Sequence, residues 1–259
     1  MPNKSLYFIT DAHLGAGNDS LQRERELCAL LDHIKDDAAT VVFLGDMFDF
    51  WFTYRYVVPK GHVRLLGKMA EMSDAGIELH FFIGNHDMWL FDYLKDEVGA
   101  IMHNDPDTLV FDGKRFLIGH GDGLGHLDRR YDFIRRIFRC RLNQRMFALL
   151  PSGLTFGIAH SWSNSSRKSH IKKNPKIFEY QGDDREGIII YCKQMLAKEH
   201  YDYCVFGHRH TPIVKDDCLP NCTYVNVGDW LLHRNYAVYT GGSLTLHDLL
   251  LESPITNAR

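Results

Sequence analysis

Cysteine is sparse in this chain of 259 residues, and long apolar runs are missing from it. The six cysteines form no CxxC pair, and Cys218 and Cys222 have no second pair to match them, which argues against a zinc knuckle. Free thiols in a reducing setting are the simpler expectation. The first residues, MPNKSLYFITDAHLG, contain no apolar run of signal-peptide length, and no other stretch has a membrane-spanning length. We therefore expect a cytoplasmic protein.

Charge is present but unevenly distributed. The net charge is only −3, whereas Gly123–Tyr180 contains twelve Lys and Arg against three Asp and Glu, a local charge of +9. Such asymmetry within one chain is typical of a basic segment that meets an anionic partner. The overall acidity argues against nucleic acid as that partner.

Short apolar runs alternate with helical patterns along much of the chain. Buried strands are predicted at Leu6–Thr10, Thr40–Leu44 and Glu78–Ile83. Helices are predicted between them at Asp19–Asp36 and Gly61–Ala75. A later helix and further short strands are predicted at Asp184–Lys198 and at Phe116–Ile118, Asp202–Phe206, Thr223–Val227, Tyr236–Tyr239 and Ser243–His247. This order predicts one α/β domain over residues 1–259, with two facing sheets and helices outside.

Residues 124–176 interrupt this alternation with a long, mostly helical stretch, and Pro151–Gly153 marks a break between its helices. Seven arginines between Arg129 and Arg145 are interleaved with aromatic and branched apolar side chains. Because the stretch lies between two motifs that carry candidate metal ligands, we expect it to cover the site as a lid. A helix pair packed on the core, with a solvated arginine face, is the alternative.

Five short motifs follow predicted strands, where α/β folds place their ligands. They are DAH at 11–13, GD at 45–46, GNHD at 84–87, GHGD at 119–122 and GHRH at 207–210. Each motif alone is weakly specific, whereas five of them in order at strand ends are hard to obtain by chance. Together they offer seven candidate metal ligands, which are Asp11, His13, Asp46, Asn85, His120, His208 and His210.

This donor set combines carboxylate, amide and imidazole groups without a thiolate, so it suits Mn, Fe or Zn. Seven ligands are too many for one ion and suit two. A bridging carboxylate reduces the repulsion between two cations, and two ions roughly 3.5–4 Å apart can bind a phosphate group and activate water for in-line attack. We therefore predict two divalent cations, with Mn²⁺ favoured and Fe, Zn or Mg as alternatives.

In this order the motifs resemble the calcineurin-like metallophosphoesterase family, from Asp11 to about Trp230. The resemblance implies a four-layer αββα sandwich with a helical lid insertion. It also implies that one ion binds Asp11, His13, Asp46 and His210, and that the other binds Asp46, Asn85, His120 and His208. His86 would then act with Asn85 near the leaving group, and Asp87 would orient His86 by a hydrogen bond.

The stretches DAHLG, GDMFDFW, HGDGLGHLDRRY and VNVGDW are similar to one branch of that family, the UDP-2,3-diacylglucosamine hydrolases. The similarity implies cleavage of the pyrophosphate of a UDP-diacylsugar in lipid A biosynthesis, giving UMP and 2,3-diacylglucosamine 1-phosphate. It implies substrate contacts through Asp128 and Tyr131, eight and eleven residues after the His of GHGD. Basic Arg135 and Lys173 are further candidates, with Asn85 and His86. The best-known members of the branch have Arg where this chain has His86.

A diacylated UDP-sugar, or a related phosphoanhydride or phosphodiester, requires a site that accepts an anion, and acyl tails also require an apolar surface. The insertion at 124–176 is both basic and apolar, and it equally suits an anionic membrane surface, with the protein peripheral on the inner face of the inner membrane. Two alternatives stay open: a metallophosphoesterase for a soluble nucleotide or phosphodiester, and a non-catalytic scaffold of the same fold.

Overall fold

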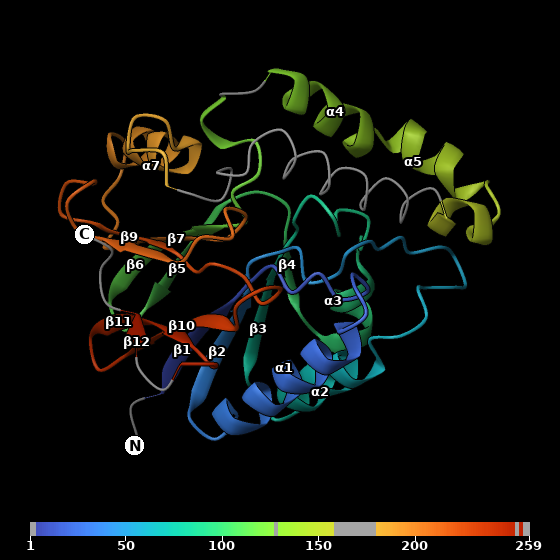
Figure 1. Ribbon diagram of the computed structural model, residues 1–259, viewed down its shortest axis with the longest axis horizontal. Helices are drawn as coiled ribbons and strands as arrows, with labels where there is room; N and C mark the ends of the chain where they lie inside the picture. The colour runs from blue at the N-terminus through green and yellow to red at the C-terminus, as the bar shows by residue number, and fades with distance from the viewer. Residues whose placement is uncertain (1–3, 127–128, 158–179, 252–253, 256–259) are drawn as a thin grey trace.

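Two β-sheets stand face to face at the centre of the computed structural model, which describes all residues except 1–3, 127–128, 158–179, 252–253 and 256–259 (Figure 1). The larger sheet contains β1 (Ser5–Ile9), β2 (Ala38–Phe43), β3 (Glu78–Phe82), β4 (Ile101–His103), β10 (Asn235–Thr240), β11 (Ser243–Asp248) and β12 (Pro254–Ile255). Its strand order is β12-β11-β10-β1-β2-β3-β4. The smaller sheet contains β5 (Asp107–Phe111), β6 (Lys114–Gly119), β7 (Tyr203–Phe206), β8 (Ile213–Lys215) and β9 (Thr223–Asn226). Its order is β5-β6-β7-β9-β8.

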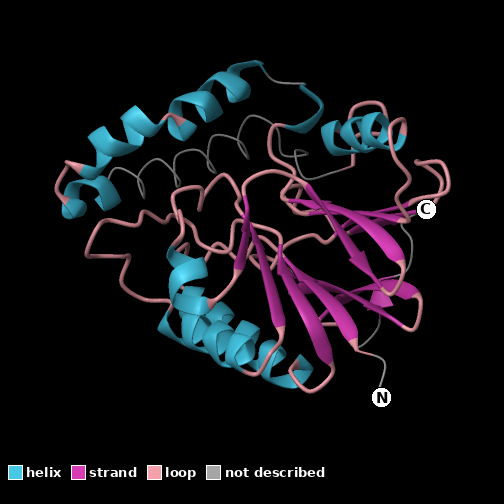
Figure 2. Ribbon diagram, turned by 180° about the vertical axis from the view of Figure 1, so that it is seen from behind, coloured by secondary structure: helices cyan, strands magenta, loops and turns pink. Residues whose placement is uncertain are grey.

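Helices cover the outer faces of both sheets, as Figure 2 shows. Helices α1 (Ser20–Ile34), α2 (Val63–Asp74) and α3 (Tyr93–Val98) pack on the larger sheet, and α7 (Gly187–Leu196) packs on the smaller one. In α1 the packed positions follow helical spacing, since Leu27, Leu30, Leu31 and Ile34 are all buried. These layers confirm the four-layer αββα sandwich.

The parallel strands β1, β2 and β3 are apolar on both faces because each face meets another layer. Along β1, Tyr7 and Ile9 belong to the cluster shared with the helices, whereas Leu6 and Phe8 belong to the cluster between the sheets. Side chains of a strand point to alternate faces, so one short run contributes to two cores. The continuous apolar runs in the sequence therefore identify the central strands.

The predicted helices and strands are all present with ends shifted by a few residues, but several elements were not predicted. Strands β4, β8 and β12 have three residues or fewer, too short for alternation to be visible in the sequence. Strand β5 and helix α3 were also missed. No side chain of β5 is buried, so its sequence does not alternate clearly between apolar and polar residues, and α3 has only six residues.

The basic insertion begins with the short helix η1 (Leu124–His126) and continues as α4 (Arg129–Arg139) and α5 (Arg141–Ala148), which cross one end of the sandwich in Figure 1. The chain turns near Pro151 as predicted, but it also breaks at Cys140, which has an extended backbone with φ −69° and ψ 117°. The side chains of Asn143 and Gln144 donate to the last carbonyl groups of α4, those of Ile137 and Phe138. Polar side chains thus satisfy the helix end and stabilise this break.

The loop after β1 is tied to helix α1 by a buried arginine. Arg23 is 1% exposed, and its guanidinium donates to the carbonyl oxygens of Ala12 (3.3 Å), His13 (3.2 Å) and Ala16 (2.5 Å). Asp19 accepts a further hydrogen bond from it and balances its charge. Without the guanidinium, buried carbonyl groups of this loop would lose their donors.

We predict that Arg23→Met lowers the free energy of unfolding by about 3 kcal/mol, because buried acceptors and a carboxylate lose their partner. Urea denaturation measures the change. The matched control is Arg25→Met on the exposed face of the same helix, which should change the free energy of unfolding by less than about 0.5 kcal/mol. Equal stabilities of the two variants would contradict the role given to Arg23.

Candidate metal centre

The five motifs lie in loops that leave the carboxyl ends of five strands. In the larger sheet the parallel strands β1, β2 and β3 each lead to one motif, and in the smaller sheet the parallel strands β6 and β7 lead to the other two. Because the carboxyl ends of parallel strands meet at the same edge of a sheet, the motifs face one end of the sandwich. The seven side chains at that edge are Asp11, His13, Asp46, Asn85, His120, His208 and His210.

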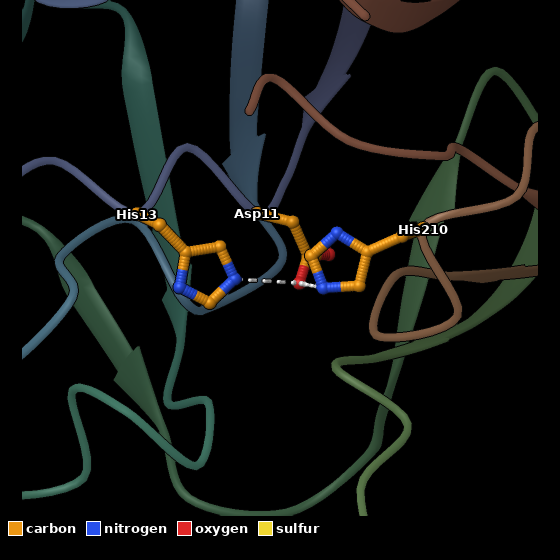
Figure 3. A group of neighbouring side chains, drawn as sticks. All are labelled: Asp11, His13 and His210. Carbon is orange, nitrogen blue, oxygen red and sulfur yellow. Dashed lines mark ion pairs between the residues drawn. The ribbon is translucent and has the colours of Figure 1, made fainter. Parts of the chain in front are cut away.

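One group of donors consists of Asp11, His13 and His210, whose ligand atoms all lie within 4.8 Å of one another (Figure 3). Oδ1 of Asp11 is 3.6 Å from Nε2 of His13 and 3.4 Å from Nε2 of His210. The two imidazole rings are stacked, with centroids 5.2 Å apart. Two nitrogens and a carboxylate oxygen therefore converge from opposite sheets.

A second group consists of Asp46, His120 and His208, again within 4.8 Å of one another. Oδ2 of Asp46 is 3.3 Å from Nε2 of His120, and that nitrogen is 3.2 Å from Nδ1 of His208. The same Oδ2 lies 3.9 Å from Nε2 of His13, in the first group. Asp46 thus belongs to the second group and reaches the first, and a third group of ligand atoms within 4.8 Å of one another joins it to His13 and His86.

Several candidate ligand atoms at this edge are buried and have no hydrogen-bond partner among the described residues. They are Oδ1 of Asp11, both ring nitrogens of His13, and Oδ1 of Asn85. A buried polar atom left without a partner costs on the order of 1–3 kcal/mol, so such atoms are rare unless something else satisfies them. Oxygen and nitrogen donors aimed into one space fit a pair of divalent cations.

The backbone at these ligands is strained. Within the described parts of the chain, nine residues other than glycine have a positive φ, a region that side chains with a Cβ rarely adopt, and five of them are candidate ligands. Such conformations persist at functional sites, where the surrounding structure imposes them. The five ligands and their φ values are Asp11 (51°), His13 (42°), Asp46 (53°), His208 (67°) and His210 (52°).

Two motif glycines allow the loops to approach these ligands closely. A Cβ added at Gly84 would lie 2.2 Å from Oδ1 of Asp46, and one at Gly207 would lie 2.1 Å from Oγ1 of Thr10. Neither distance can be relieved by moving a flexible side-chain end, because Asp46 and Thr10 are themselves buried. Glycine at these positions is therefore required by space.

Neighbouring charged groups shift the pKa values of the side chains at this edge. Burial alone would favour neutral groups, but the nearby imidazoles of His120, His86 and His13 hold the pKa of Asp46 well below its usual range. Burial likewise disfavours a charged His13, yet the carboxylates of Asp11, Asp49 and Asp46 outweigh it and raise the pKa of His13 to about 10. Burial and the neighbouring His120 lower the pKa of His208 to about 4. The carboxylates are ionised and available to cations at neutral pH.

His86 lies at the margin of the two groups. Its ring meets the His13 ring edge-on, with centroids 4.7 Å apart, and its backbone N–H donates to Oδ1 of Asp46 at 2.7 Å. Its Nδ1 is 2.9 Å from the carbonyl oxygen of Asp49 and 3.7 Å from the carboxylate of that residue. The ring is partly open to the solvent, unlike the buried ligands Asp46 and His13.

The expectation that Asp87 orients His86 is wrong. The Asp87 carboxylate is buried and accepts the backbone N–H groups of Gly84 (2.8 Å) and Met47 (2.9 Å), and among the described residues no hydrogen bond joins it to the His86 ring. It fastens the GNHD loop to the GD loop, so we remove it from the catalytic set. Asp49, three residues after Asp46, contacts His86 instead. Its spacing within GDMFD was the available signal in the sequence.

Two of the predicted substrate contacts lie on helix α4 beside the site. The Tyr131 hydroxyl donates to the Asp122 carboxylate at 2.9 Å, and Nε of Arg135 lies 3.4 Å from the same carboxylate. Asp122 is the last residue of GHGD, so α4 rests directly against a ligand loop. Asp128 and Lys173 lie outside the described residues.

Comparison with known proteins gives a consistent result. A family model described as calcineurin-like phosphoesterase matches residues 4–212. A Porphyromonas gingivalis protein named UDP-2,3-diacylglucosamine hydrolase is 40% identical over 256 residues, covering 94% of this chain and 97% of that protein. An Aeromonas hydrophila protein of the same name is 28% identical over 228 residues, covering 87% of this chain and 90% of the relative.

Among solved structures, vacuolar protein sorting 29 from Cryptosporidium parvum superposes with a TM-score of 0.50 at 12% sequence identity, covering 98% of this chain and 96% of that one. At this identity the likeness concerns the fold alone.

We predict that Mn²⁺ binding releases protons. His13 has a pKa of about 10, so its ring is charged at pH 7, whereas a metal ligand must be neutral. Affinity for Mn²⁺ should therefore rise with pH between about 6 and 9. Isothermal titration in two buffers of different ionisation enthalpy measures the released protons. Identical heats in the two buffers, with binding intact, would contradict the prediction.

Proposed function

Because the chain belongs to the calcineurin-like phosphoesterase family, we propose that it is a metal-dependent hydrolase that cleaves the pyrophosphate bond of UDP-2,3-diacylglucosamine. One water is consumed, and the products are UMP and 2,3-diacylglucosamine 1-phosphate, as in lipid A biosynthesis. The observation that carries the proposal is the set of overlapping donor groups at this edge, two of which contain Asp46. The named relatives, which this chain matches over nearly their full length, support the substrate.

The donor set supports two divalent ions. We assign Asp11, His13, Asp46 and His210 to one ion, and Asp46, Asn85, His120 and His208 to the other, with Mn²⁺ as the proposed metal and Fe, Zn or Mg as alternatives. When bound, such ions supply Lewis acidity, which activates water and neutralises charge on the phosphate. The proposed ligands Asp11, His13 and Asp46 are buried, and their backbones have positive φ values, which is typical of residues whose conformation the surrounding structure imposes.

His86 and Asn85 are the proposed catalytic residues. The His86 side chain is 21% exposed, and its Nδ1 is directed at the Asp49 carbonyl oxygen. A neutral ring that donates Nδ1–H to that carbonyl presents Nε2 towards the site. To donate to the departing oxygen of the sugar phosphate, the ring must first take up a second proton on Nε2, so the form that acts as an acid is the imidazolium. The Asn85 amide adds a polar contact for a phosphate oxygen.

Tyr131 and Arg135 are proposed to meet the substrate from helix α4. Arg135 lies beside Asp122 and lines a small cleft that reaches the proposed metal ligand His120. A guanidinium at the rim of such a cleft suits an anionic phosphate group. Asp128 and Lys173 stay in the proposal through sequence spacing and charge alone.

The insertion at 124–176 is proposed to act as a lid that receives the acyl chains and contacts the membrane. Helices α4 and α5 expose Phe133 (64%), Leu142 (64%) and Met146 (59%), next to arginines on the same helices. Exposed apolar side chains mixed with basic ones suit an anionic lipid surface. Among the described residues, no helix has the length and apolar character needed to cross a bilayer. We therefore propose a cytoplasmic protein, peripheral on the inner face of the inner membrane.

We predict that the protein with Mn²⁺ hydrolyses long-chain UDP-2,3-diacylglucosamine far faster than a simple aryl phosphodiester. Measuring UMP release and aryl alcohol release under equal conditions tests this. A chelator should abolish both reactions, and Asp46→Asn should lower kcat/KM by about 10³-fold or more, because both ions lose a ligand. Arg25→Ala, on the exposed face of α1, is the control. Faster turnover of the aryl substrate would favour a soluble phosphodiester, and no turnover of either would favour a scaffold.

We predict that replacing Phe133, Leu142 and Met146 together by Ser weakens binding to anionic phosphatidylglycerol vesicles by at least about tenfold, since apolar burial and charge both contribute to it. Vesicle sedimentation measures the binding. The control is Val63→Ser, because Val63 is 72% exposed on the opposite helical layer. Unchanged binding of the triple variant would exclude α4 and α5 as the membrane contact.

A further inference from the structure

The segment between β9 and β10 passes directly beneath the candidate metal centre. The Trp230 backbone N–H donates to the carbonyl oxygen of Asp11 at 3.1 Å, and the Trp230 indole donates to the carbonyl oxygen of Arg23 at 3.2 Å. Asn226, at the end of β9, donates to the carbonyl oxygen of Gly207 at 2.6 Å. The segment is therefore bonded to the loops of the first and the last motif.

Asp229 is the ionisable residue at the centre of this segment, and it is fully buried. Its Oδ1 accepts the backbone N–H groups of Leu232 (2.6 Å) and His233 (3.0 Å), which fix the carboxylate. Its Oδ2 lies 3.5 Å from Nδ1 of His210 and 3.4 Å from Nδ1 of His233. One oxygen is thus anchored by the backbone while the other faces two imidazoles.

The His210 ring lies between this carboxylate and the first donor group. Its Nδ1 lies 3.5 Å from Oδ2 of Asp229, and its Nε2 lies 3.4 Å from Oδ1 of Asp11. Figure 3 shows the His210 ring beside the Asp11 carboxylate. A neutral imidazole has one N–H and one lone pair. A carboxylate only accepts, so it selects the form with the hydrogen on Nδ1 and leaves the lone pair on Nε2.

The groups around the Asp229 carboxylate are hydrogen-bond donors. It accepts the backbone N–H groups of Leu232 and His233 and faces the His210 imidazole. An ionised carboxylate has no hydrogen to offer to Nδ1, so the wrong form of the His210 ring would place two lone pairs face to face.

We infer that Asp229 is a positioning residue, which fixes the orientation and hydrogen placement of His210 so that the lone pair of Nε2 faces the first donor group. This inference rests on the proposed function, because it assigns His210 to a metal. Carboxylates that accept the second N–H of a metal-bound histidine also raise the basicity of the ligand.

The Nδ1 atoms of His120 and His210 face partners of different charge. His120, in the second donor group, has the same orientation, with Nε2 towards Asp46 and Nδ1 2.8 Å from the carbonyl oxygen of Leu44. A neutral carbonyl orients His120, whereas a carboxylate orients His210. The imidazole of His210 should therefore be more basic than that of His120. The affinity for the ion bound by His210 should also depend more strongly on the carboxylate that orients this ring.

The test is a double-mutant cycle on metal binding, without substrate. Asp229→Asn keeps an oxygen for the backbone amides but presents an amide N–H₂ to Nδ1 of His210, which favours the wrong ring form. Calorimetric titration with Mn²⁺ alone should show two ions bound by the unmodified chain, and about 10- to 100-fold weaker binding of one of them in Asp229→Asn. In an His210→Ala background, Asp229→Asn should have no further effect.

Asp248→Asn is the matched control, because Asp248 is another buried carboxylate that accepts a backbone amide, that of Leu250, on a strand two places from β1. It should bind both ions like the unmodified chain. Unchanged Mn²⁺ affinity in Asp229→Asn, or equal losses with and without His210, would overturn the positioning role. Because no substrate is present, a chain that binds two ions but does not cleave the diacyl substrate would overturn the proposed function alone.

Discussion

The Asp46 carboxylate joins the two groups of nitrogen and oxygen donors, because it lies 3.3 Å from Nε2 of His120 in its own group and 3.9 Å from Nε2 of His13 in the other. Ligands from both sheets reach this place because parallel strands end at the same edge. Space for Asp46 depends on Gly84, where any side chain would collide with the carboxylate. The GNHD loop can therefore approach the Asp46 carboxylate this closely only because residue 84 is glycine.

The candidate site contains features that destabilise the folded state, and hydrogen bonds made by nearby buried side chains offset them. Five candidate ligands have strained backbones, and several of their polar atoms are buried without partners among the described residues. Buried side chains outside the donor groups hold the loops in place: Arg23 binds the loop after β1, Asp87 joins two motif loops, and Asp229 reaches under His210. Each uses hydrogen bonds to backbone groups or rings, which explains why polar residues occur deep in this core.

The sequence was most informative where chemistry and chain order coincide. Asp11 and His13 could be predicted because their motif follows a continuous apolar run that ends at the strand edge. Asp87 was misassigned because adjacency to His86 in the sequence does not reveal which way a carboxylate turns. Asp229 lies nineteen positions after His210, and only the folded chain brings the two together. The break at Cys140 depends on side chains that cap the preceding helix, which residue types alone do not specify.

The central claim concerns two cations that share Asp46, and anomalous scattering from Mn²⁺-soaked crystals tests it most directly. If two cations share Asp46, the anomalous map should contain two Mn²⁺ peaks, roughly 3.5–4 Å apart, on either side of the Asp46 carboxylate. One would be contacted by His13 and His210, and the other by His120 and His208. A single peak, or two peaks without Asp46 between them, would show that Asp46 does not bridge two cations.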